Sequence, residues 1–536
     1  MKNIWAFDTE DDGQGNIYFI NFYNGKEHFT FTQRQEAINF LRTQKGRFWA
    51  TNLEYDLANI FGDDLSLVKW RFGKSKLIMA QFKRVYFYDT LNHWKMSVEE
   101  MGNRLGFQKL PFNPQLLDYC KRDTEITYLF TKEMIGFYEK LGAKTKSTIA
   151  STAFNYWKDF SGFQIPYVSK NRERIAIIPK MILEKWRLAY YGGRTEVFHI
   201  GEVKGNIFYI DINSMYPFNM LGRFCYPFTY QPKADIEAEG ITFAKVRSDL
   251  KLPILPYRAK TGRLIFPNGT FQGAWTNDEL RYFLENGGKI LKIHGGFTFP
   301  VQCDPFTNYI NLLYSKRRVA RDELEKLTYK NILNNTYGKF GQGCEFTVME
   351  TYQEFLKRKN FKGSGKRFGN LVTFTYEADY PYNTNFIWAA QITARSRILL
   401  HRIMQDIFNK GNKLLYCDTD SVIFKGSLKG IKISDALGEA KLVDKLSKFN
   451  CRTNKIYKMD MQDESSAIRC KGVPSKYQKE FFETGHASYM KPLRIREALR
   501  RELRPNLWIA HEKAMVTEYS KRIVLKNGET VPIILK

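Results

Sequence analysis

Three short apolar runs along the chain each end at acidic residues. The first occupies residues 3–7 and precedes Asp8-Thr9-Glu10, and the second occupies residues 207–210 and precedes Asp211. The third precedes Tyr416-Cys417-Asp418-Thr419-Asp420-Ser421, and another apolar run follows it. Apolar runs of this length beside turn-prone polar residues are typical of β-strands. We therefore predict two strands that end in carboxylates and one β-hairpin with carboxylates at its tip.

The acids at the ends of these strands have the chemistry of a metal site. Carboxylates at a tight turn can hold divalent cations through oxygen. Two such cations can activate an attacking hydroxyl and stabilise a leaving pyrophosphate. A solvated acidic turn is the alternative for Asp418 and Asp420 taken alone. Residues 212–217, which follow Asp211, indicate a turn into a helix, and backbone N–H groups at a helix start suit a triphosphate.

A cationic helical face is predicted between these acids. Lys326, Lys330, Asn334 and Tyr337 are spaced by four, four and three residues, which places them on one side of a helix. Arg318 lies two four-residue steps earlier and can share that face. Cations there could bind phosphates and Tyr337 could stack on a base, whereas a solvated basic face is the more usual outcome of such spacing.

The N-terminal third contains a second acidic set. Asp8 and Glu10 are two apart in a predicted strand, so both can point at one metal ion. Asp56 and Asp123 follow, and Tyr119 precedes Asp123 by one helical turn. Residues 8–13 also resemble the start of an EF-hand calcium loop. That reading is disfavoured, because the loop needs a Glu where this chain has Phe19, and because a strand precedes it.

Composition points to an anionic polymer as partner. The chain has 536 residues, enough for several domains, and 83 basic against 56 acidic residues give a net charge of +27. Its 31 tyrosines suit stacking on unpaired bases, although core packing claims most aromatic residues. No apolar run is long enough for a membrane span, and no signal peptide is expected. The seven scattered cysteines indicate no zinc site and a reducing compartment.

Three segments resemble the polymerase motifs of family B DNA polymerases. They are the segment at Asp211, the string Lys-x-x-x-Asn-x-x-Tyr-Gly at 330–338, and the acidic hairpin. The resemblance implies that Asp211 and Asp420 hold two Mg²⁺ ions, with Mn²⁺ as a substitute, and that Asp418 is a weaker or indirect ligand. It also implies that Tyr216 lies under the sugar and excludes a 2′-hydroxyl. The expected nucleotide-binding residues are Tyr216, Arg318, Lys326, Lys330, Asn334 and Tyr337.

The N-terminal acids resemble the two-metal 3′–5′ exonuclease of proofreading polymerases. The resemblance implies that Asp8, Glu10, Asp56 and Asp123 hold two metal ions and that Tyr119 orients the attacking water. Lys109 lies where small phage polymerases carry a catalytic lysine, although the local match is loose.

Further segments resemble DNA-contacting elements of the same family. Tyr190-Tyr191-Gly192-Gly193 resembles the Tyr-x-Gly-Gly element that contacts template, and its glycines permit close backbone approach. An ordinary tight turn is the alternative. Lys455-Ile456-Tyr457 resembles a Lys-x-Tyr element near the primer terminus. The expected DNA contacts are Asn52, Tyr55, Thr90, Leu91, Tyr190, Gly192, Gly193, Lys455 and Tyr457.

The spacing of the motifs resembles that of protein-primed family B polymerases, which carry two insertions. Residues 341–385 are expected to form a β-rich arm that wraps DNA and assists strand displacement. Its expected phosphate contacts are Lys357, Arg358, Lys359, Lys362, Lys366 and Arg367. The other insertion contacts a priming protein.

The resemblance implies an α/β and α+β multidomain fold, with a ribonuclease-H-like exonuclease domain and a right-hand polymerase. The expected division is exonuclease 1–155, palm 156–222 and 386–469, insertions 223–306 and 341–385, fingers 307–340, and thumb 470–536. We expect Arg494, Arg496, Arg500 and Arg501 of the thumb to meet phosphates or lie in solvent.

The implied partners are template and primer DNA, deoxynucleotides and a terminal protein. We expect a monomer without membrane contact, in the host cytoplasm if the protein is viral. A primer-independent family B polymerase shares every catalytic motif and remains open. A nucleic-acid-primed enzyme is less favoured because 88 positions separate Lys330 from Asp418. An inactive DNA-binding subunit is disfavoured by the complete acidic sets.

Overall fold

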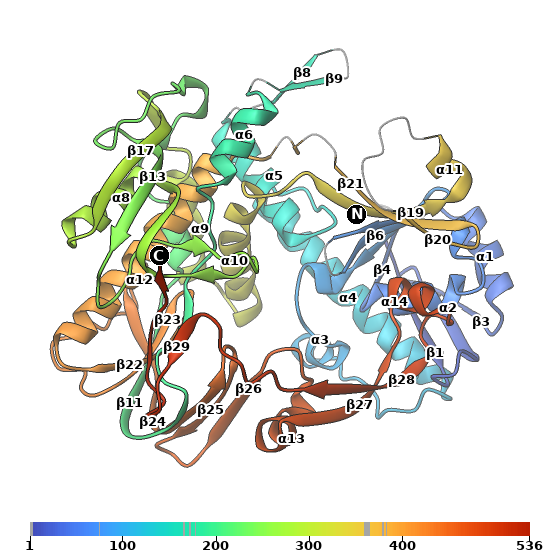
Figure 1. Ribbon diagram of the computed structural model, residues 1–536. Coiled ribbons are helices and arrows are strands. Elements are labelled where there is room, and N and C mark those ends of the chain that lie inside the picture. The colour runs from blue at the N-terminus through green and yellow to red at the C-terminus, as the bar shows by residue number, and fades with distance from the viewer. Residues whose placement is uncertain are drawn as a thin grey trace.

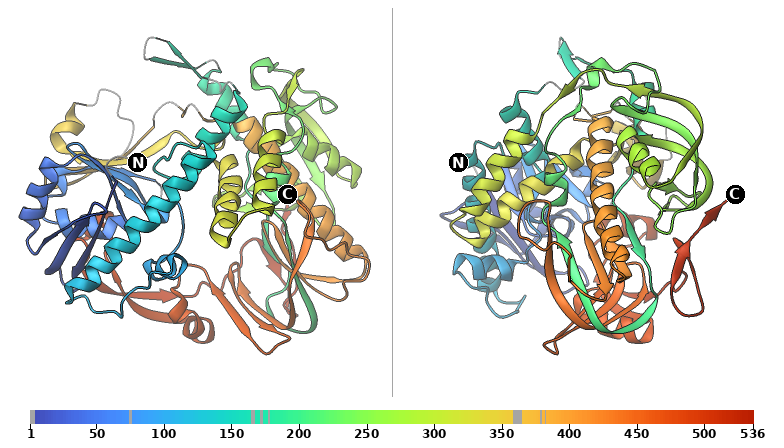
Figure 2. Two further views of the ribbon diagram at one scale, coloured as in Figure 1. Left: turned by 180° about the vertical axis from the view of Figure 1, so that it is seen from behind. Right: turned by 90° about the vertical axis from the view of Figure 1, so that its left-hand side faces the viewer.

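The computed structural model describes residues 4–73, 76–163, 167–170, 173–176, 178–357, 365–377, 380–381 and 383–536. Figure 1 shows two sheet-based bodies side by side, and Figure 2 shows the long helices between them. The mixed α/β, multidomain architecture that we predicted is confirmed. Within the described part of the chain, no helix has both the length and the apolarity to cross a membrane. All seven cysteines are free.

The N-terminal body is built on a ten-stranded mixed sheet. Its centre is parallel, because β1 (Ile4–Asp11) pairs with β4 (Gly46–Ala50), which pairs with β7 (Val85–Asp89). Antiparallel strands extend the sheet on both sides. Beyond β1 lie β2 (Ile17–Tyr23) and β3 (His28–Phe31), and beyond β7 lie β6 (Leu77–Phe82) and β5 (Lys69–Phe72). Helices α1 (Arg34–Thr43), α2 (Leu53–Phe61), α3 (Val98–Leu105) and α4 (Leu117–Leu141) complete this body.

Three strands between residues 345 and 377 extend the same sheet, although they lie far along the chain. β19 (Glu345–Thr351) pairs with β5 and with β21 (Leu371–Glu377), which pairs with β20 (Gly365–Phe368). α11 (Tyr352–Leu356) follows β19 directly. Among the six cations expected on this arm, Lys357, Lys366 and Arg367 are exposed, and Arg358, Lys359 and Lys362 lie outside the described residues.

The second body is built on a seven-stranded antiparallel sheet. Helix α12 (Phe386–Asn409) covers one face, where its Leu400, Met404 and Ile407 pack in one core with Leu414 and Phe424. In sheet order the strands are β10 (Thr195–Val197), β22 (Lys413–Asp418), β23 (Ser421–Lys425), β11 (Gly201–Ile212), β24 (Ala440–Thr453), β25 (Ile456–Met461) and β26 (Ser466–Cys470).

The cationic helix is interrupted. Arg318 is the last residue of α9 (Thr307–Arg318), and α10 (Glu323–Thr336) begins only after Asp322, whose carboxylate accepts a hydrogen bond from the Glu325 N–H. Our expectation that Arg318 shares a face with Lys326 and Lys330 is therefore wrong, because an N-cap starts a new helix. α5 (Ile149–Ser161) packs against both helices.

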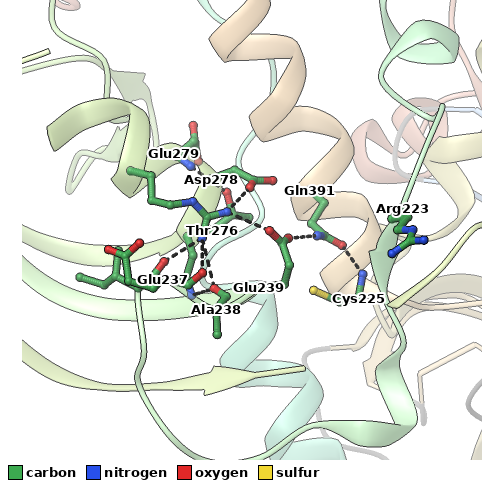
Figure 3. A network of polar contacts seen from close by, with 12 residues as sticks. Arg223, Cys225, Glu237, Ala238, Glu239, Thr276, Asp278, Glu279 and Gln391 are labelled. Carbon is green, nitrogen blue, oxygen red and sulfur yellow. Dashed lines mark hydrogen bonds and ion pairs between the residues drawn. The ribbon is translucent and has the colours of Figure 1, made fainter. Parts of the chain in front are cut away.

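Residues 223–306 form three strands of a four-stranded sheet that is fixed to α12, and the C-terminal β31 supplies the fourth. The sheet order is β17 (Lys289–Thr298), β13 (Gly240–Ser248), β16 (Asn268–Thr276) and β31 (Ile534–Leu535), and α8 (Asn277–Glu285) follows β16. Gln391 of α12 donates to Glu239 at 3.3 Å and accepts from the Cys225 N–H at 3.1 Å, as Figure 3 shows. Asp278 also bonds Arg395 of α12 at 3.4 Å. These bonds tie the segment to the helix that backs the second sheet.

The C-terminal segment, for which a thumb at 470–536 stays a prediction, contacts both bodies. β27 (His486–Pro492) and β28 (Trp508–Ala514) form a hairpin, and α14 (Ile495–Arg501) at its tip joins the N-terminal body. Ile495 is fully buried there, and its N–H donates to Glu54 at 3.1 Å. Arg496 is half-buried and lies over the Phe72 ring at 4.5 Å, so this cation is not free in solvent.

Residues 516–535 then return to the second body, where β31 pairs with β16. The remaining short elements are α6 (Lys180–Arg187), α7 (Met215–Phe218), α13 (Gln478–Thr484), β8 (Tyr167–Lys170), β9 (Glu173–Ala176), β12 (Phe224–Cys225), β14 (Tyr257–Arg258), β15 (Leu264–Ile265), β18 (Gln302–Cys303), β29 (Arg522–Val524) and β30 (Thr530–Pro532).

Candidate active sites

The second sheet brings Asp211 and Asp420 together. β11 carries Asp211 beside Ser421 of β23, and the Ile212 N–H donates to the Asp420 carbonyl at 2.7 Å. The predicted hairpin is confirmed, with Thr419 and Asp420 in its turn. Burial raises the pKa of both carboxyls, and for Asp420 the charge of Asp211 adds to this, bringing its pKa to about 6. Two half-buried acids that resist ionisation together are suited to a bound cation.

Asp418 is held differently, because protein groups occupy both of its oxygens. Oδ1 accepts from the Thr195 hydroxyl at 2.9 Å and from the Thr419 hydroxyl at 3.2 Å, and Oδ2 pairs with Lys455 Nζ at 2.9 Å. This arrangement favours Asp211 and Asp420 as the metal ligands and leaves Asp418 as an indirect participant. It also places Lys455, which we expected near the primer terminus, at the acidic hairpin.

The predicted nucleotide-binding residues lie on α10, on α9 and in the turn after β11. Lys330 is close enough to lower the pKa of both Asp211 and Asp420. Tyr216 stacks on Tyr337, with ring centroids 4.2 Å apart at 22°. Asn334, one turn before Tyr337, is half-buried. Lys326 instead pairs with Glu323 at 3.1 Å.

Arg317, rather than its neighbour, reaches the turn. Its Nη1 donates to the Ser214 hydroxyl at 3.0 Å, whereas Arg318 is exposed. Lys441 of β24 also lies beside the site, with Nζ 3.8 Å from Asp211 Oδ2. Sequence spacing did not identify either cation, because both positions depend on tertiary contacts.

The double-glycine segment packs directly against the acidic hairpin. A Cβ at Gly193 would lie 2.9 Å from Thr419 Cγ2 and 3.1 Å from the Tyr216 hydroxyl, whereas a Cβ at Gly192 would meet nothing within 4 Å. Arg397 of α12 fixes the segment by donating to the Tyr191 carbonyl at 2.8 Å and to the Gly192 carbonyl at 3.0 Å. Gly193 thus permits close packing, and the Gly192 side is open to a ligand.

Aromatic and cationic side chains line a cavity beside this segment. A cavity of about 1830 Å³ between the two bodies is lined by groups that include Tyr190, Arg187, Arg258 and Lys339. Tyr457, the other residue of the Lys-x-Tyr element, is half-buried against Tyr416, 5.1 Å between ring centroids. Such a lining suits a nucleic-acid strand.

The four acids of the N-terminal body also meet. β1 supplies Asp8 and Glu10, α2 supplies Asp56, and α4 supplies Asp123. Burial raises the pKa of Asp8 and Asp56 well above the usual value, and in Asp8 the neighbouring acids raise it further. Burial and Asp123 bring the pKa of Glu10 to about 7. The EF-hand alternative is wrong, because these residues lie on a strand.

Two buried carboxylate oxygens in this group, Asp56 Oδ2 and Asp123 Oδ1, have no protein partner in the described part of the chain. Ligand atoms of Asp8, Glu10 and Cys120 lie within 4.8 Å of one another. Because buried polar atoms are normally satisfied, the unpartnered oxygens fit a cation. Metal ions would therefore complete a site that is otherwise short of positive charge.

Lys109 joins the N-terminal site although its sequence match is loose. Its Nζ pairs with Asp123 Oδ2 and lies 4.6 Å above the Tyr119 ring. Burial alone would lower the pKa of Lys109, but the hydrogen bonds to Asp123 and Tyr119 outweigh it and raise the pKa. A permanent cation thus lies beside the acids.

Asp89 organises the loops expected to contact DNA near this site. Its Oδ1 accepts from the N–H groups of Asn52 at 3.2 Å and Leu91 at 2.9 Å. Asn52 is exposed, with a left-handed φ of 74°. Tyr55 donates to Asp11 at 2.7 Å. Thr90 is fully buried and bonded to Thr51 at 2.9 Å, so this structure does not support a direct DNA contact by its side chain.

Comparison with known proteins agrees with this geometry. The profile of a family described as DNA polymerase type B, organellar and viral, matches residues 78–379. This chain belongs to that family. Our prediction of a family B polymerase is thereby confirmed.

Named relatives of this type B chain are DNA polymerases. A probable DNA polymerase of Podospora anserina is 25% identical over 482 residues, covering 78% of this chain and 38% of the relative. The DNA-directed DNA polymerase of Enterobacteria phage PRD1 is 28% identical over 374 residues, covering 67% and 62%. The chain thus spans less than two thirds of either relative.

The fold of this type B chain is similar to that of Phi29 DNA polymerase complexed with primer-template DNA and incoming nucleotides. The TM-score is 0.73 at 17% identity, and the match covers 96% of this chain and 99% of the other. At that identity the likeness concerns the fold alone, and the roles of individual residues are argued from the geometry above.

Proposed function

We propose that this protein is a template-directed DNA polymerase with a 3′–5′ proofreading exonuclease. The observation that carries the proposal is the presence of two separate groups of buried or half-buried carboxylates, one on each sheet-based body. Each group has raised pKa values or unpartnered oxygens that suit divalent cations. Family membership and the fold likeness support the same activity.

For synthesis, Asp211 and Asp420 would hold two Mg²⁺ or Mn²⁺ ions. Metal ions held there would supply activation of the primer hydroxyl and stabilisation of negative charge on the phosphoryl group. Lys330 and Arg317 would bind the triphosphate, since both cations lie at the site. Tyr216, held by its stack on Tyr337, would lie under the sugar and exclude a 2′-hydroxyl.

For proofreading, Asp8, Glu10, Asp56 and Asp123 would hold the second pair of metal ions. Lys109 would stabilise negative charge beside Asp123, and Tyr119 would orient the attacking water. Asn52, Tyr55 and Leu91 would guide the frayed primer strand toward these acids. Separate sites let synthesis and degradation be tested independently.

Protein priming is the mode of initiation that we propose, with a separate terminal protein offering the first hydroxyl. The fixed segment 223–306 suits a docking role toward that protein. The arm at 345–377 suits processive synthesis and displacement of a downstream strand. The protein would act as a monomer in replicating a viral or mobile-element genome, in the host cytoplasm if it is viral.

Substitution of the two acidic groups tests the activities. Asp211→Ala and Asp420→Ala should abolish nucleotide incorporation and leave degradation of single strands intact. Asp8→Ala, Glu10→Ala and Asp123→Ala should do the converse and raise copying errors. Asp444→Ala, a half-buried acid on the same sheet, is the matched control. Normal primer extension by the Asp211 or Asp420 variant would refute the assignment of the metal ligands.

An initiation assay tests the priming mode. Primer-free template is incubated with labelled deoxynucleotides, with and without a candidate terminal protein. Label transferred to that protein supports protein priming, and synthesis without it supports the primer-independent alternative.

A further inference from the structure

Strand β10 is a three-residue edge strand that contacts the acidic hairpin. Thr195 lies opposite Asp418, and Val197 lies opposite Tyr416. The Thr195 hydroxyl donates to Asp418 Oδ1 at 2.9 Å, and the Arg194 carbonyl accepts from the Thr419 N–H at 2.7 Å. One short strand therefore holds both the carboxylate and the backbone of the turn that carries Asp420.

A strand this short has few ladder hydrogen bonds of its own, and residues 516–535, the C-terminal strap, supply others. Lys521 Nζ donates to the Thr195 carbonyl at 2.8 Å. The Tyr519 hydroxyl accepts from the Val197 N–H at 2.8 Å, and the Thr530 hydroxyl donates to the Val197 carbonyl at 2.7 Å. The strap thus binds the side of β10 that has no neighbouring sheet strand.

A buried ion cluster joins the strap to β10. Glu196 is 0% exposed, Arg194 1% and Arg522 5%. Arg194 Nε donates to Glu196 Oε2 at 2.7 Å, and Arg522 Nη1 lies 3.4 Å from Oε1. Burial acts to raise the pKa of Glu196, but the two guanidinium groups outweigh it and lower the pKa. Buried charges tolerate little displacement from their partners, so the cluster fixes the register of β10.

We infer that Thr195 is a positioning residue for nucleotide transfer: its hydroxyl fixes the Asp418 carboxylate, and the C-terminal strap fixes Thr195. The inference deepens the proposed polymerase function and rests on it. The other two groups that hold Asp418 belong to the hairpin turn, Thr419, and to the turn before β25, Lys455. Thr195 is the contact that connects this carboxylate to the strap. Small displacements of acids beside a reacting phosphoryl group reduce the rate of transfer.

The first experiment compares two substitutions of Thr195 in the full-length protein. Thr195→Val keeps the shape and removes the hydroxyl, whereas Thr195→Ser keeps the hydroxyl. Single-nucleotide incorporation into a primed template should be slowed about 10-fold or more by Thr195→Val, with KM for the nucleotide unchanged. Thr195→Ser should retain nearly the wild-type rate. Single-strand degradation should be unaffected in both, which reports that the protein is folded.

The second experiment tests the strap with a matched pair of lysines. Lys521→Met removes the hydrogen bond to Thr195, and it should lower the incorporation rate without changing KM. Lys526→Met makes the same change at an exposed position between β29 and β30, and it should have no effect.

Each result decides a specific point. A Thr195→Val enzyme as fast as wild type overturns the inference, and so do equal losses in Thr195→Val and Thr195→Ser, which would indicate packing alone. Equal rates in the two lysine variants overturn the role of the strap. A wild-type protein that cannot extend a primer refutes the proposed function itself, so the two failures are distinguishable.

Discussion

At the scale of residues, the hydrogen-bond partners of an aspartate's oxygens decide whether that carboxylate is available to a metal ion. Both oxygens of Asp418 are bonded to protein groups, whereas Asp56 and Asp123 each leave one buried oxygen without a partner. Burial raises the pKa of Asp8 and of Asp420, and neighbouring acids raise both further. Such groups impose a cost on the folded protein that a cation relieves.

Acidification and metal should therefore stabilise the protein through the same residues. Glu10 has its pKa raised from 4.5 to about 7, so between these values the folded state binds more protons than the unfolded state. Its contribution to the free energy of unfolding thus falls as pH rises through this window and stays low above pH 7. In EDTA, the wild-type melting temperature should fall more between pH 5 and pH 8 than that of Glu10→Gln.

Mg²⁺ added at pH 8 should raise the melting temperature of the wild-type protein again. The reason is that a ligand that binds only the folded state raises its stability. Differential scanning calorimetry of both proteins, with and without metal, measures this. Identical pH profiles would show that Glu10 does not titrate in this range.

The stack of Tyr216 on Tyr337 leads to a prediction about sugar selection. Tyr216→Val should admit ribonucleotides, because the smaller side chain leaves room for a 2′-hydroxyl beside the stacked ring. The ratio of kcat/KM for deoxy- and ribonucleotides, from single-nucleotide kinetics, measures it. Tyr209→Val, on the strand just before Asp211, is the control and should keep the discrimination. Unchanged selectivity in Tyr216→Val would mean that this ring only packs.

At the scale of elements, the strands that carry acids could be predicted because a period of two and an acidic end are local signals. The Asp418–Asp420 hairpin and the β1 acids are of this kind. The break before α10 could have been found from Asp322, a good N-cap, but side-chain spacing alone concealed it. Thr195, Arg317 and Asp89 could not be found, because their partners are distant in sequence and only folding brings them together.

The arm at 345–377 can be shortened so that edge strand β20 is lost but β19 keeps its pairing with β5 and with β21. Thr351 and Leu371 are paired residues of β19 and β21, so an Asn-Gly turn can replace residues 352–370. This variant should fill short gaps nearly normally and lose most displacement of a downstream strand. The physical reason is that the removed tip carries exposed cations, whose phosphate contacts are sensitive to salt.

Product lengths after a single binding event, on gapped and on duplex templates, measure this. Long products through duplex DNA from the shortened protein would show that the tip has no part in displacement. They would also remove a main support for the protein-primed reading.

At the scale of the whole molecule, the two bodies are connected at more than one place. The β27–β28 hairpin leaves the second body and ends on the N-terminal body, where Asn506 donates to the Tyr55 carbonyl at 2.7 Å (Figure 1). β19 makes another connection by pairing with β5. The chain therefore closes on itself around the region where DNA is proposed to bind.

Loosening the docked hairpin should reduce processivity more than it reduces chemistry. Ile495→Ala removes a fully buried side chain from the contact, which costs about 2–5 kcal/mol. Products from one binding event should shorten, while the rate of single-nucleotide incorporation stays close to wild type. Leu503→Ala, at a residue 42% exposed near the same tip, is the control. Equal product lengths in the two variants would show that docking is irrelevant to retention on the template.

The pairing of β19 with β5 also sets the order in which this protein can mature on the ribosome. β5 ends at Phe72 and β19 begins at Glu345. At ordinary elongation speeds, β5 waits roughly 14–55 s with one edge unprotected. Open strand edges recruit other chains, so the nascent N-terminal body is exposed to misassembly until the middle of the message has been translated. Conditions that slow elongation should therefore lower the yield of native protein, and early release of the nascent chain should favour aggregates.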